Sequence, residues 1–334
     1  MIKVGVVGMG IRGQLYAQTV QQNNYAKLQA VSDAYEPSLA AACERFGAKG
    51  YSHIEHMLEQ EQLDVLIVAT PDYLHKAPVL AAASKGVHIL VEKPFSTSLE
   101  EAEIMYSAVQ KSGIKCMVAF ENRWNSPFVA VQEAIRQGEI GRVLTMNSRL
   151  NDTIYVPTKM LKWSQGSSPG WFLLPHSIDL ALWFKGVKPV KVFAAGSKGK
   201  LAGMGIDTYD SIQAIISFED GTHSSFTTSW VLPESMPMIY DFKYEIIGSD
   251  GALYVDLADQ MVRQASSSYR HMHTLGTSIN GQLGAAPNYM LNAFIDNVRL
   301  DTEPLASSAD GLLNTRVVAA IHQSIKSGIS IHIQ

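Results

Sequence analysis

Several features that mark particular classes of protein are scarce in this 334-residue sequence. Cysteine occurs only twice, at Cys43 and Cys116, and neither lies in a Cys-x-x-Cys or histidine-rich setting. The sequence therefore predicts no bound metal and two reduced thiols in the core. No apolar run reaches the length that spans a membrane, and the first residues lack the charged start and long apolar segment of a signal peptide. We therefore expect a cytoplasmic protein.

An excess of charge of either sign is also missing. The chain has 27 Lys and Arg residues against 31 Asp and Glu residues, and its formal net charge is -4. The two signs are interspersed, so we expect no surface for nucleic acid or membranes and predict that the partners are a small-molecule substrate and copies of the same chain. With 46% hydrophobic and 17% charged residues, the composition is that of a globular protein, and the length suits two domains.

A glycine-rich motif follows the first predicted strand, residues 3–7, and precedes a predicted helix over residues 14–22. Its residues are Gly8, Met9, Gly10, Ile11, Arg12 and Gly13. In this setting the glycines permit a tight turn and the close approach of a pyrophosphate, while the helix N-terminus supplies amide donors. The motif predicts a dinucleotide site; a glycine turn that binds nothing is the alternative.

An acidic residue stands where such a site would bind the ribose. Asp33 follows the next predicted strand, residues 28–32, and lies 20 residues after Gly13, which is the spacing of the acidic residue that bonds the ribose hydroxyls. A carboxylate there would repel a 2′-phosphate, which favours NAD as the cofactor. Arg12 could approach a phosphate from the glycine turn, so NADP stays open.

Strands and helices alternate through the first part of the chain. Beyond the elements above, we predict strands over residues 65–69, 87–91 and 116–119, and helices over residues 36–46, 53–60, 75–85 and 98–111. Ser98 is the predicted N-cap of the last of these helices. This alternation predicts an α/β domain with a doubly wound parallel sheet, the Rossmann arrangement, over residues 1–121.

Polar residues follow two of these strands. Thr70, Pro71 and His75 come after the strand over residues 65–69, and Glu92, Lys93 and Pro94 come after the strand over residues 87–91. The carboxyl ends of parallel strands form the edge where ligands bind. Pro94 biases Lys93 towards an extended conformation, so its ammonium group would project from a stiff turn. An exposed lysine in an ordinary loop is the alternative, and His75 fits a helix cap or a core position equally well.

Residues 122–334 form the predicted second domain, an α+β unit for substrate binding and oligomerisation. Strands over residues 143–150, 190–197, 211–218, 222–231, 240–247 and 253–255 predict a large open, mainly antiparallel sheet. We expect one face to pack on a helix that begins at Pro175. The other face, carrying Phe226 and Trp230, would need cover, which predicts a homodimer or homotetramer through this sheet. The last two predicted helices span residues 289–300 and 310–327, and they could pack back on the first domain.

Two stretches of the second domain carry candidate site residues. The irregular segment over residues 151–170 has the length of a binding loop and includes Tyr155 and Trp163. His176 lies in the first turn of the helix from Pro175, where the positive helix end lowers its pKa and favours the neutral imidazole of a general base. A structural histidine is the alternative. Asp179, one turn further on, could orient His176 or serve as a cap.

Three motifs in order resemble the glucose-fructose oxidoreductase and inositol dehydrogenase family (Gfo/Idh/MocA). They are the glycine turn over residues 8–13, the Ala-Thr-Pro-Asp-Tyr-Leu-His stretch over residues 69–75, and Glu92-Lys93-Pro94. The resemblance extends along nearly the whole chain. It implies a two-domain oxidoreductase in which the lysine of the third motif reaches the substrate.

The resemblance also assigns individual residues. It implies that six residues lie beside the cofactor, namely Thr70, Pro71, His75, Glu92, Lys93 and Asn122. It places Arg123 at the cleft, although a polar residue at a helix start explains Arg123 as well. His176 followed by Asp179 resembles the family's catalytic helix start. Many members have aspartate four residues before this histidine; here Phe172 stands at that position and removes a carboxylate that could have shared the proton transfer or bound a hydroxyl.

Three hypotheses follow for the function. The first is an NAD(P)-dependent dehydrogenase of a polyol, cyclitol, sugar or sugar derivative, in which His176 takes the hydroxyl proton and Lys93 holds and polarises the same oxygen. The second is a dinucleotide-binding sensor or regulator without turnover. The third is an enzyme that uses transient oxidation for glycoside elimination and recycles its NAD.

Overall fold

The computed structural model describes residues 1–267 and 269–333. The chain divides into two compact units. The first unit comprises Met1–Trp124 and Ser278–Thr315, and the second comprises Asn125–Thr277 and Arg316–Gln334. Each unit has a sheet and a hydrophobic core of its own.

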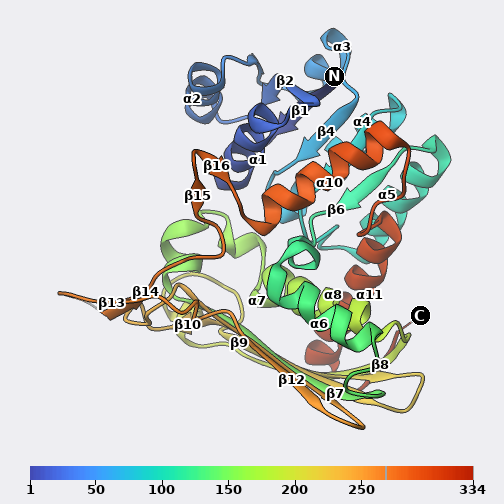
Figure 1. Ribbon diagram of the computed structural model, residues 1–334, viewed down its shortest axis with the longest axis vertical. Coiled ribbons are helices and arrows are strands. Elements are labelled where there is room, and N and C mark those ends of the chain that lie inside the picture. Colours follow the sequence, from blue (N-terminus) through green and yellow to red (C-terminus); the bar gives the residue numbers. More distant parts are fainter. Residues whose placement is uncertain (268, 334) are drawn as a thin grey trace. The chain divides into compact units, whose positions relative to one another are not determined.

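The first unit is built on a six-stranded parallel sheet with the order β3-β2-β1-β4-β5-β6 (Figure 1). The strands are β1 (Ile2–Val7), β2 (Ala26–Ser32), β3 (Lys49–Tyr51), β4 (Val65–Val68), β5 (His88–Val91) and β6 (Cys116–Val118). This order confirms the predicted doubly wound parallel sheet. Strand β3 was not predicted, because three residues with two polar or glycine positions give no apolar run.

Helices cover both faces of this sheet. They are α1 (Ile11–Gln22), α2 (Glu36–Phe46), α3 (Ile54–Gln60), α4 (Lys76–Ser84), α5 (Leu99–Ser112) and α10 (Ala286–Leu300). Helix α1 contacts α2 and α10, while α4 contacts α3 and α5. All four residues of β4 are fully buried, as a strand between two helical layers requires. The side chain of Ser98 accepts a hydrogen bond from the Glu101 N–H and caps α5, as its sequence position predicted.

The second unit is built on a seven-stranded sheet with the order β12-β11-β7-β10-β9-β8-β17. Strands β7 and β10 are parallel and the other neighbours are antiparallel, which confirms the predicted open, mainly antiparallel sheet. The strands are β7 (Val143–Thr153), β8 (Pro189–Ser197), β9 (Ser211–Phe218), β10 (His223–Leu232), β11 (Tyr240–Gly248), β12 (Ala252–Asp256) and β17 (Ile331–His332).

Helices of the second unit gather on one side of its sheet (Figure 1). They include α6 (Ser126–Arg136), α7 (Pro169–Phe172) and α8 (Leu174–Lys185). Helix α9 (Lys200–Gly203) is a single turn, and α11 (Ser308–Ser327) starts in the first unit and ends in the second. The remaining elements are η1 (Asp72–Leu74), η2 (Glu121–Trp124), η3 (Val156–Met160), η4 (Ser164–Gly166) and four short strands, β13 (Arg263–Ala265), β14 (Tyr269–His271), β15 (Ser278–Ile279) and β16 (Gln282–Leu283).

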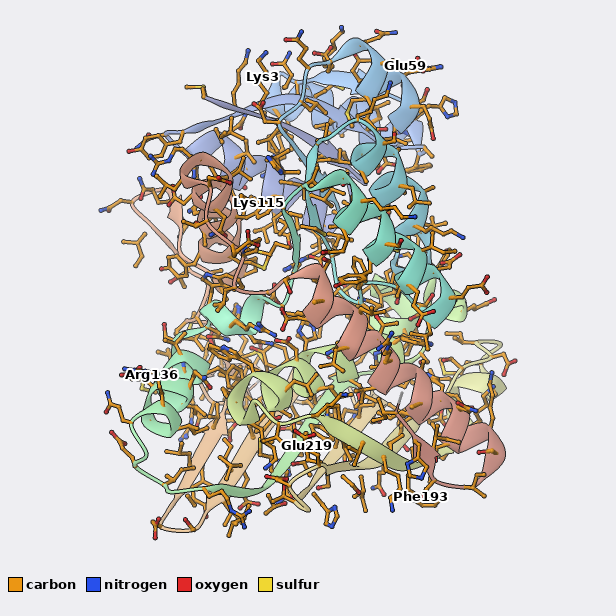
Figure 2. The ribbon with its side chains drawn as sticks, turned by 90° about the vertical axis from the view of Figure 1, so that its right-hand side faces the viewer. Lys3, Glu59, Lys115, Arg136, Phe193 and Glu219 are labelled. Atoms are coloured by element: carbon orange, nitrogen blue, oxygen red, sulfur yellow. The ribbon has the colours of Figure 1, made fainter. Side chains whose placement is uncertain are left out.

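The prediction that Phe226 and Trp230 lie on the uncovered face of this sheet is wrong. Their side chains are 1% and 0% exposed, and β10 contacts α7 and α8, so both rings belong to the core. Successive side chains of a strand point to opposite faces of the sheet, so an assignment that is wrong by one residue places every side chain on the wrong face. The uncovered face instead carries Phe193, which is 46% exposed and lies on the outer side of the sheet (Figure 2).

Three further observations concern membranes, metals and thiols. Within the described ranges, no helix combines the length and apolar character needed to cross a bilayer. The described side chains also include no group of three His, Cys, Asp or Glu residues placed to hold a metal ion. Cys43 and Cys116 are free thiols, and burial raises the pKa of Cys116 to about 12, which leaves this thiol unreactive.

Candidate functional site

Loops that follow five strands of the first sheet carry most of the predicted site residues. The glycine turn follows β1, Asp33 follows β2, and Thr70 follows β4. Lys93 lies just beyond β5, and Asn122 lies in η2, just beyond β6. Because the strands are parallel, these residues gather at the carboxyl edge of one sheet.

The glycines of the turn have different tasks. Gly8 has φ +88°, and a Cβ built there would lie 2.6 Å from the backbone of Ala69. A Cβ on Gly13 would lie 1.8 Å from the Gly8 carbonyl oxygen, so α1 can start close to β1 only with glycine at this position. A Cβ on Gly10 would meet no described atom within 4 Å. The first and last glycines therefore serve the fold, while Gly10 leaves open space at the start of α1, as a bound pyrophosphate requires.

Asp33 is fixed beside this turn. Its Oδ2 accepts a hydrogen bond from the Met9 N–H at 2.6 Å, and its Oδ1 accepts one from the Tyr35 N–H at 2.7 Å. Two backbone donors hold the carboxylate in one orientation, and each oxygen retains a lone pair for a ribose hydroxyl. Ile11 is exposed next to the turn.

His75 joins the loops after β4 and β5. Its Nδ1 lies 2.8 Å from the Pro94 carbonyl oxygen and its Nε2 lies 3.1 Å from the Thr70 carbonyl oxygen. The ring is 1% exposed, so we expect His75 to position the two loops, and its place beside the cofactor stays a prediction. Pro71 precedes η1. The Thr70 hydroxyl is buried and has no hydrogen-bond partner among the described residues, which leaves it available to a ligand.

Lys93 is a half-buried residue in a charged surrounding. The Lys93-Pro94 peptide bond is cis. Burial lowers the pKa of the Lys93 ammonium; the charges of Glu92, Asp72 and Glu121 oppose this effect, Arg12 adds to it, and the net shift is downward. The backbone N–H of Lys93 donates to Glu92 Oε2 at 3.1 Å, so the side chain of Glu92 contributes to the local backbone geometry.

Arg12 does not extend from the glycine turn into solvent. Its guanidinium pairs with Glu92 and Glu121 and donates to the Tyr16 hydroxyl at 2.8 Å. These four residues form a cluster, called here the Arg12 cluster, at the same edge of the sheet. Tyr16 and Glu92 are buried in it, whereas Arg12 and Glu121 are half-buried. Neither Tyr16 nor Glu121 was predicted, although both had signals: Tyr16 lies one turn after Arg12 on α1, and Glu121 follows β6.

The two neighbouring residues of η2 are buried in the first unit. Asn122 is 8% exposed and Arg123 is 5% exposed. Arg123 donates to the Leu305 carbonyl oxygen at 2.6 Å and pairs with Asp310 at 3.1 Å. Burial opposes ionisation of Asp310, but the Arg123 charge and hydrogen bonds from Ser307 and Arg123 together outweigh it and lower the pKa of this carboxyl. These contacts join η2 to the start of α11, and a substrate contact of Arg123 stays a prediction.

The other predicted site residues lie in the second unit. His176 is half-buried in the first turn of α8, and Asp179 is buried one turn further on. The ring of Phe172 lies 6.1 Å from that of Trp163 and 5.6 Å from that of Trp230. The structure thus brings Phe172 and Trp163 together in an aromatic cluster. Tyr155 is exposed, with the ammonium of Lys159 over its ring.

The first unit has the parts of a dinucleotide site, and the chain continues into a separate α+β unit. This combination defines a class, the two-domain oxidoreductases with a Rossmann domain. Residues 2–120 match the family described as oxidoreductase family, NAD-binding Rossmann fold, and residues 128–254 match the Gfo/Idh/MocA C-terminal domain. The chain belongs to the Gfo/Idh/MocA family of oxidoreductases, which confirms the resemblance of its motifs.

Individual relatives span the whole chain. A myo-inositol 2-dehydrogenase from Thermotoga maritima is 24% identical, with 100% of this chain and 99% of the relative covered. A scyllo-inositol 2-dehydrogenase (NAD(+)) from Bacillus subtilis is 24% identical, with coverage of 99% and 96%. The crystal structure of scyllo-inositol dehydrogenase from Lactobacillus casei, with bound NAD(H) and scyllo-inositol, is 21% identical with a TM-score of 0.86, covering 100% of this chain and 99% of that one. This structure has the same fold.

Proposed function

We propose that this protein is an NAD-dependent dehydrogenase that acts on a CH–OH group of a polyol, cyclitol, sugar or sugar derivative. One observation carries the proposal: at a single sheet edge, an open glycine at the start of α1, a fixed carboxylate and a half-buried lysine come together. Gly10 admits the pyrophosphate, Asp33 binds the ribose, and Lys93 holds the substrate oxygen. The membership of an oxidoreductase family supports the assignment.

The cofactor we propose is NAD. The Asp33 carboxylate would repel a 2′-phosphate. The guanidinium of Arg12 is engaged by Glu92 and Glu121, so it is not offered to a phosphate from the glycine turn. These two observations favour NAD over NADP.

The chemistry divides between two residues of this chain. When bound, the nicotinamide supplies the hydride acceptor. The Lys93 ammonium would bind the hydroxyl oxygen and stabilise the negative charge that develops on it. His176 would remove the hydroxyl proton, since the N-terminal turn of α8 favours its neutral form. In the reductive direction the same groups would return the proton.

The relatives and the aromatic cluster support a ring-shaped polyol or sugar as substrate. Two relatives are named as inositol dehydrogenases. Phe172 and Trp163 present aromatic surface that suits the apolar face of a sugar ring, and we propose them with Tyr155 as substrate contacts. Phe172 stands where many family members have a carboxylate. We therefore expect a substrate that has no hydroxyl group to be hydrogen-bonded at this position.

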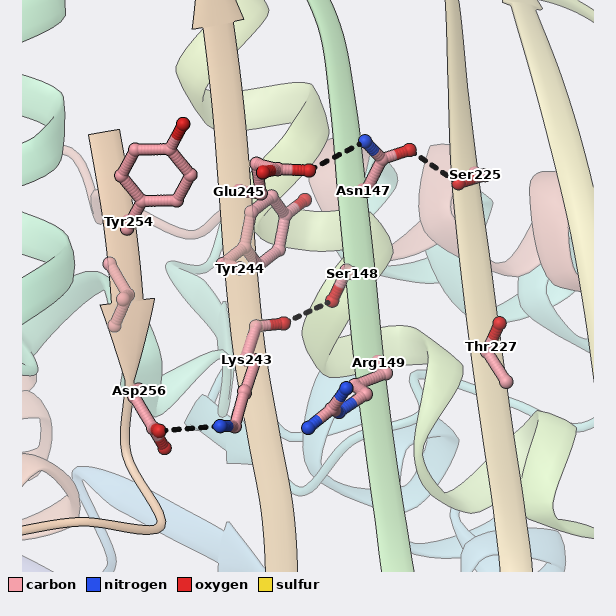
Figure 3. A pocket seen from close by; sticks show the side chains of 11 residues that line it. Asn147, Ser148, Arg149, Ser225, Thr227, Lys243, Tyr244, Glu245, Tyr254 and Asp256 are labelled. Carbon is pink, nitrogen blue, oxygen red and sulfur yellow. Dashed lines mark hydrogen bonds and ion pairs between the residues drawn. The ribbon is translucent and has the colours of Figure 1, made fainter. Parts of the chain in front are cut away.

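We further propose that the chain forms a homodimer or homotetramer through the uncovered face of the second sheet. A hollow of about 520 Å³ lies on this face, lined by residues that include Asn147, Arg149, Lys243, Tyr254 and Asp256 (Figure 3). Asn147 bridges Glu245 at 3.0 Å and Ser225 at 2.6 Å across neighbouring strands. Phe193 and Ile215, which pair on adjacent strands, add exposed apolar surface. Light scattering of the intact protein tests this assembly.

The test of the activity measures NADH absorbance when the purified protein meets NAD or NADP and a panel of cyclitols, aldoses and sugar acids. We expect turnover with NAD, and a loss of about 100-fold or more in kcat for Lys93→Ala with the Kd for NAD nearly unchanged. Lys111→Ala, which changes an exposed lysine in the last turn of α5, is the matched control.

Two other outcomes would redirect the assignment. Unchanged turnover in Lys93→Ala would refute the role of Lys93. Tight NAD binding without net reduction across the whole panel would favour a sensor or a redox-assisted eliminase. Release of a leaving group from a glycoside would then identify the eliminase.

A further inference from the structure

The position of Arg12 in the chain conflicts with the direction of its side chain. Arg12 is the second residue of α1, at the positive end of a helix, where a cation is unfavourable and a bound anion would be expected. Its side chain nevertheless turns inward: Nε donates to Glu92 Oε1 at 2.5 Å, and a terminal nitrogen pairs with Glu121. A partner other than a cofactor phosphate therefore accounts for arginine at this position.

Glu92 is the link between Arg12 and Lys93. Its Oε1 accepts one hydrogen bond from Arg12 Nε and a second, at 2.6 Å, from the Tyr16 hydroxyl. The Tyr16 hydroxyl in turn accepts a hydrogen bond from Arg12. Its Oε2 accepts the backbone N–H of Lys93. Glu92 is 6% exposed and Tyr16 is fully buried, so the bond between them is shielded from solvent. The Arg12 side chain is 31% exposed, so its bonds are only partly shielded. The Arg12 cluster thus extends to the backbone of Lys93.

The charges of the cluster also act on the Lys93 side chain. Burial disfavours the Glu92 carboxylate, but the charges of Arg12 and Lys93, with hydrogen bonds from Tyr16 and Arg12, outweigh it and lower the pKa of Glu92. The charged groups that act on Lys93 are Glu92, Asp72, Arg12 and Glu121. Without Arg12, three carboxylates of this set would attract the Lys93 ammonium and no cation of the set would compete for them.

We propose that Arg12 is a positioning residue for Lys93. Arg12 binds Glu92 and Glu121, so that neither carboxylate captures the lysine ammonium and Glu92 stays available to hold the backbone of Lys93. This inference rests on the proposed function, because the role of Lys93 is assigned there. An arginine suits the task because its planar fork reaches two carboxylates at once, whereas a lysine is a single point charge.

The test compares Arg12→Gln and Arg12→Lys with the wild-type protein in its full-length form. Arg136→Gln, an exposed arginine of α6, is the matched control. The first readout is the Kd for NAD, measured by tryptophan fluorescence. The second is the titration midpoint of the Lys93 amine, measured by competitive labelling with acetic anhydride over a pH series and mass spectrometry. Neither readout requires turnover.

For Arg12→Gln we expect the midpoint of Lys93 to move to higher pH, a Kd for NAD within about threefold of wild type, and a kcat at least tenfold lower with little change in KM. Arg12→Lys restores the charge without the fork, so its midpoint and kcat should lie between those of wild type and Arg12→Gln. Tyr16→Phe, which removes only the hydroxyl between Arg12 and Glu92, serves if Arg12→Gln does not fold, and should move the midpoint less in the same direction.

Two results would overturn the proposal. A Kd for NAD raised more than tenfold with an unchanged Lys93 midpoint would mean that Arg12 binds the cofactor. An unchanged midpoint and unchanged kcat in both Arg12 variants would mean that the cluster serves stability only. A shifted midpoint in a protein that turns over no substrate would instead uphold the role of Arg12 and reject the dehydrogenase assignment, so the two failures are distinguishable.

Discussion

The two sheets of this protein use their strands differently. In the parallel sheet of the first unit, β4 is buried along its whole length and both faces are covered, so ligand-binding residues have a place only beyond the strand ends. In the second sheet, buried residues alternate with exposed or half-buried residues along β9 and with half-buried residues along β11, and the helices lie on one face only (Figure 1). The first sheet therefore offers an edge for chemistry, and the second offers a surface for contact.

This difference decides where a mutation should act. At the edge of the first sheet, a small change of shape should affect cofactor binding and turnover. On the second sheet, the same kind of change should affect stability on one face and assembly on the other.

The largest effect is expected in the core of the second unit. Phe226→Ala removes a ring that is 1% exposed, which should lower the free energy of unfolding by about 3–5 kcal/mol. Phe193→Ala, on the uncovered face, should cost less than about 1 kcal/mol and should weaken the proposed assembly instead. Urea unfolding with light scattering on the same samples would check both expectations. Equal losses of stability would show that the two faces are not different environments.

The second prediction separates the two tasks of the glycine turn. In Gly13→Ala the new Cβ would collide with the Gly8 carbonyl, and we expect a loss of stability of about 3 kcal/mol. In Gly10→Ala the Cβ has open space, so stability should change by less than about 0.5 kcal/mol while the Kd for NAD rises at least tenfold. Chemical denaturation and fluorescence titration with NAD measure the pair. A Gly10→Ala protein with normal NAD affinity would contradict the proposed pyrophosphate position.

The smallest effects concern one carboxylate in each unit. Hydrogen bonds from Lys49, Tyr51 and Gln29 lower the pKa of Glu61 from 4.5 to about 2. Burial opposes ionisation of Asp220, but bonds from Thr222 and Lys185 outweigh it and lower its pKa from 3.8 to about 2. A depressed pKa stabilises the native state above the ordinary value, and this stabilisation is lost as the pH falls towards 2.

Glu61→Gln should therefore reduce stability at pH 7 by roughly 1–2 kcal/mol, after allowance for solvent screening, and Asp220→Asn by about 1 kcal/mol. The difference from wild type should shrink between pH 4.5 and 2 for Glu61→Gln and between pH 3.8 and 2 for Asp220→Asn. Denaturation measured across this pH range tests the sign. A difference that grows on acidification would contradict the ion pairs.

The prediction of the fold from sequence succeeded where a pattern depends on neighbours in the chain. The strand ends, the Ser98 cap and the spacing from Gly13 to Asp33 are set by residues a few positions apart or by one strand-helix-strand repeat. It failed for β3, which is too short to give a pattern, and for the faces of β10, where an error of one residue reverses inside and outside.

Several side-chain positions depended on partners far along the chain. The sequence placed Arg12 in the glycine turn, but Glu92 and Glu121, 80 and 109 residues away, turn its side chain inward. It placed Arg123 after the last strand, but Asp310, 187 residues away, holds it in the interior. Phe172 was visible as a departure from a family pattern, while its contacts with Trp163 and Trp230 were not.

The sequence by itself determined the alternation of strands and helices in the first unit, the location of the glycine turn and the presence of a lysine beyond the strand over residues 87–91, because backbone preferences and hydrophobic periodicity act over short stretches of chain. Only the tertiary structure decided which charges meet, which glycine is open and which face of the second sheet is covered. Electrostatic pairing and packing depend on distances in space, and segments far apart in the chain come together only when the whole fold forms.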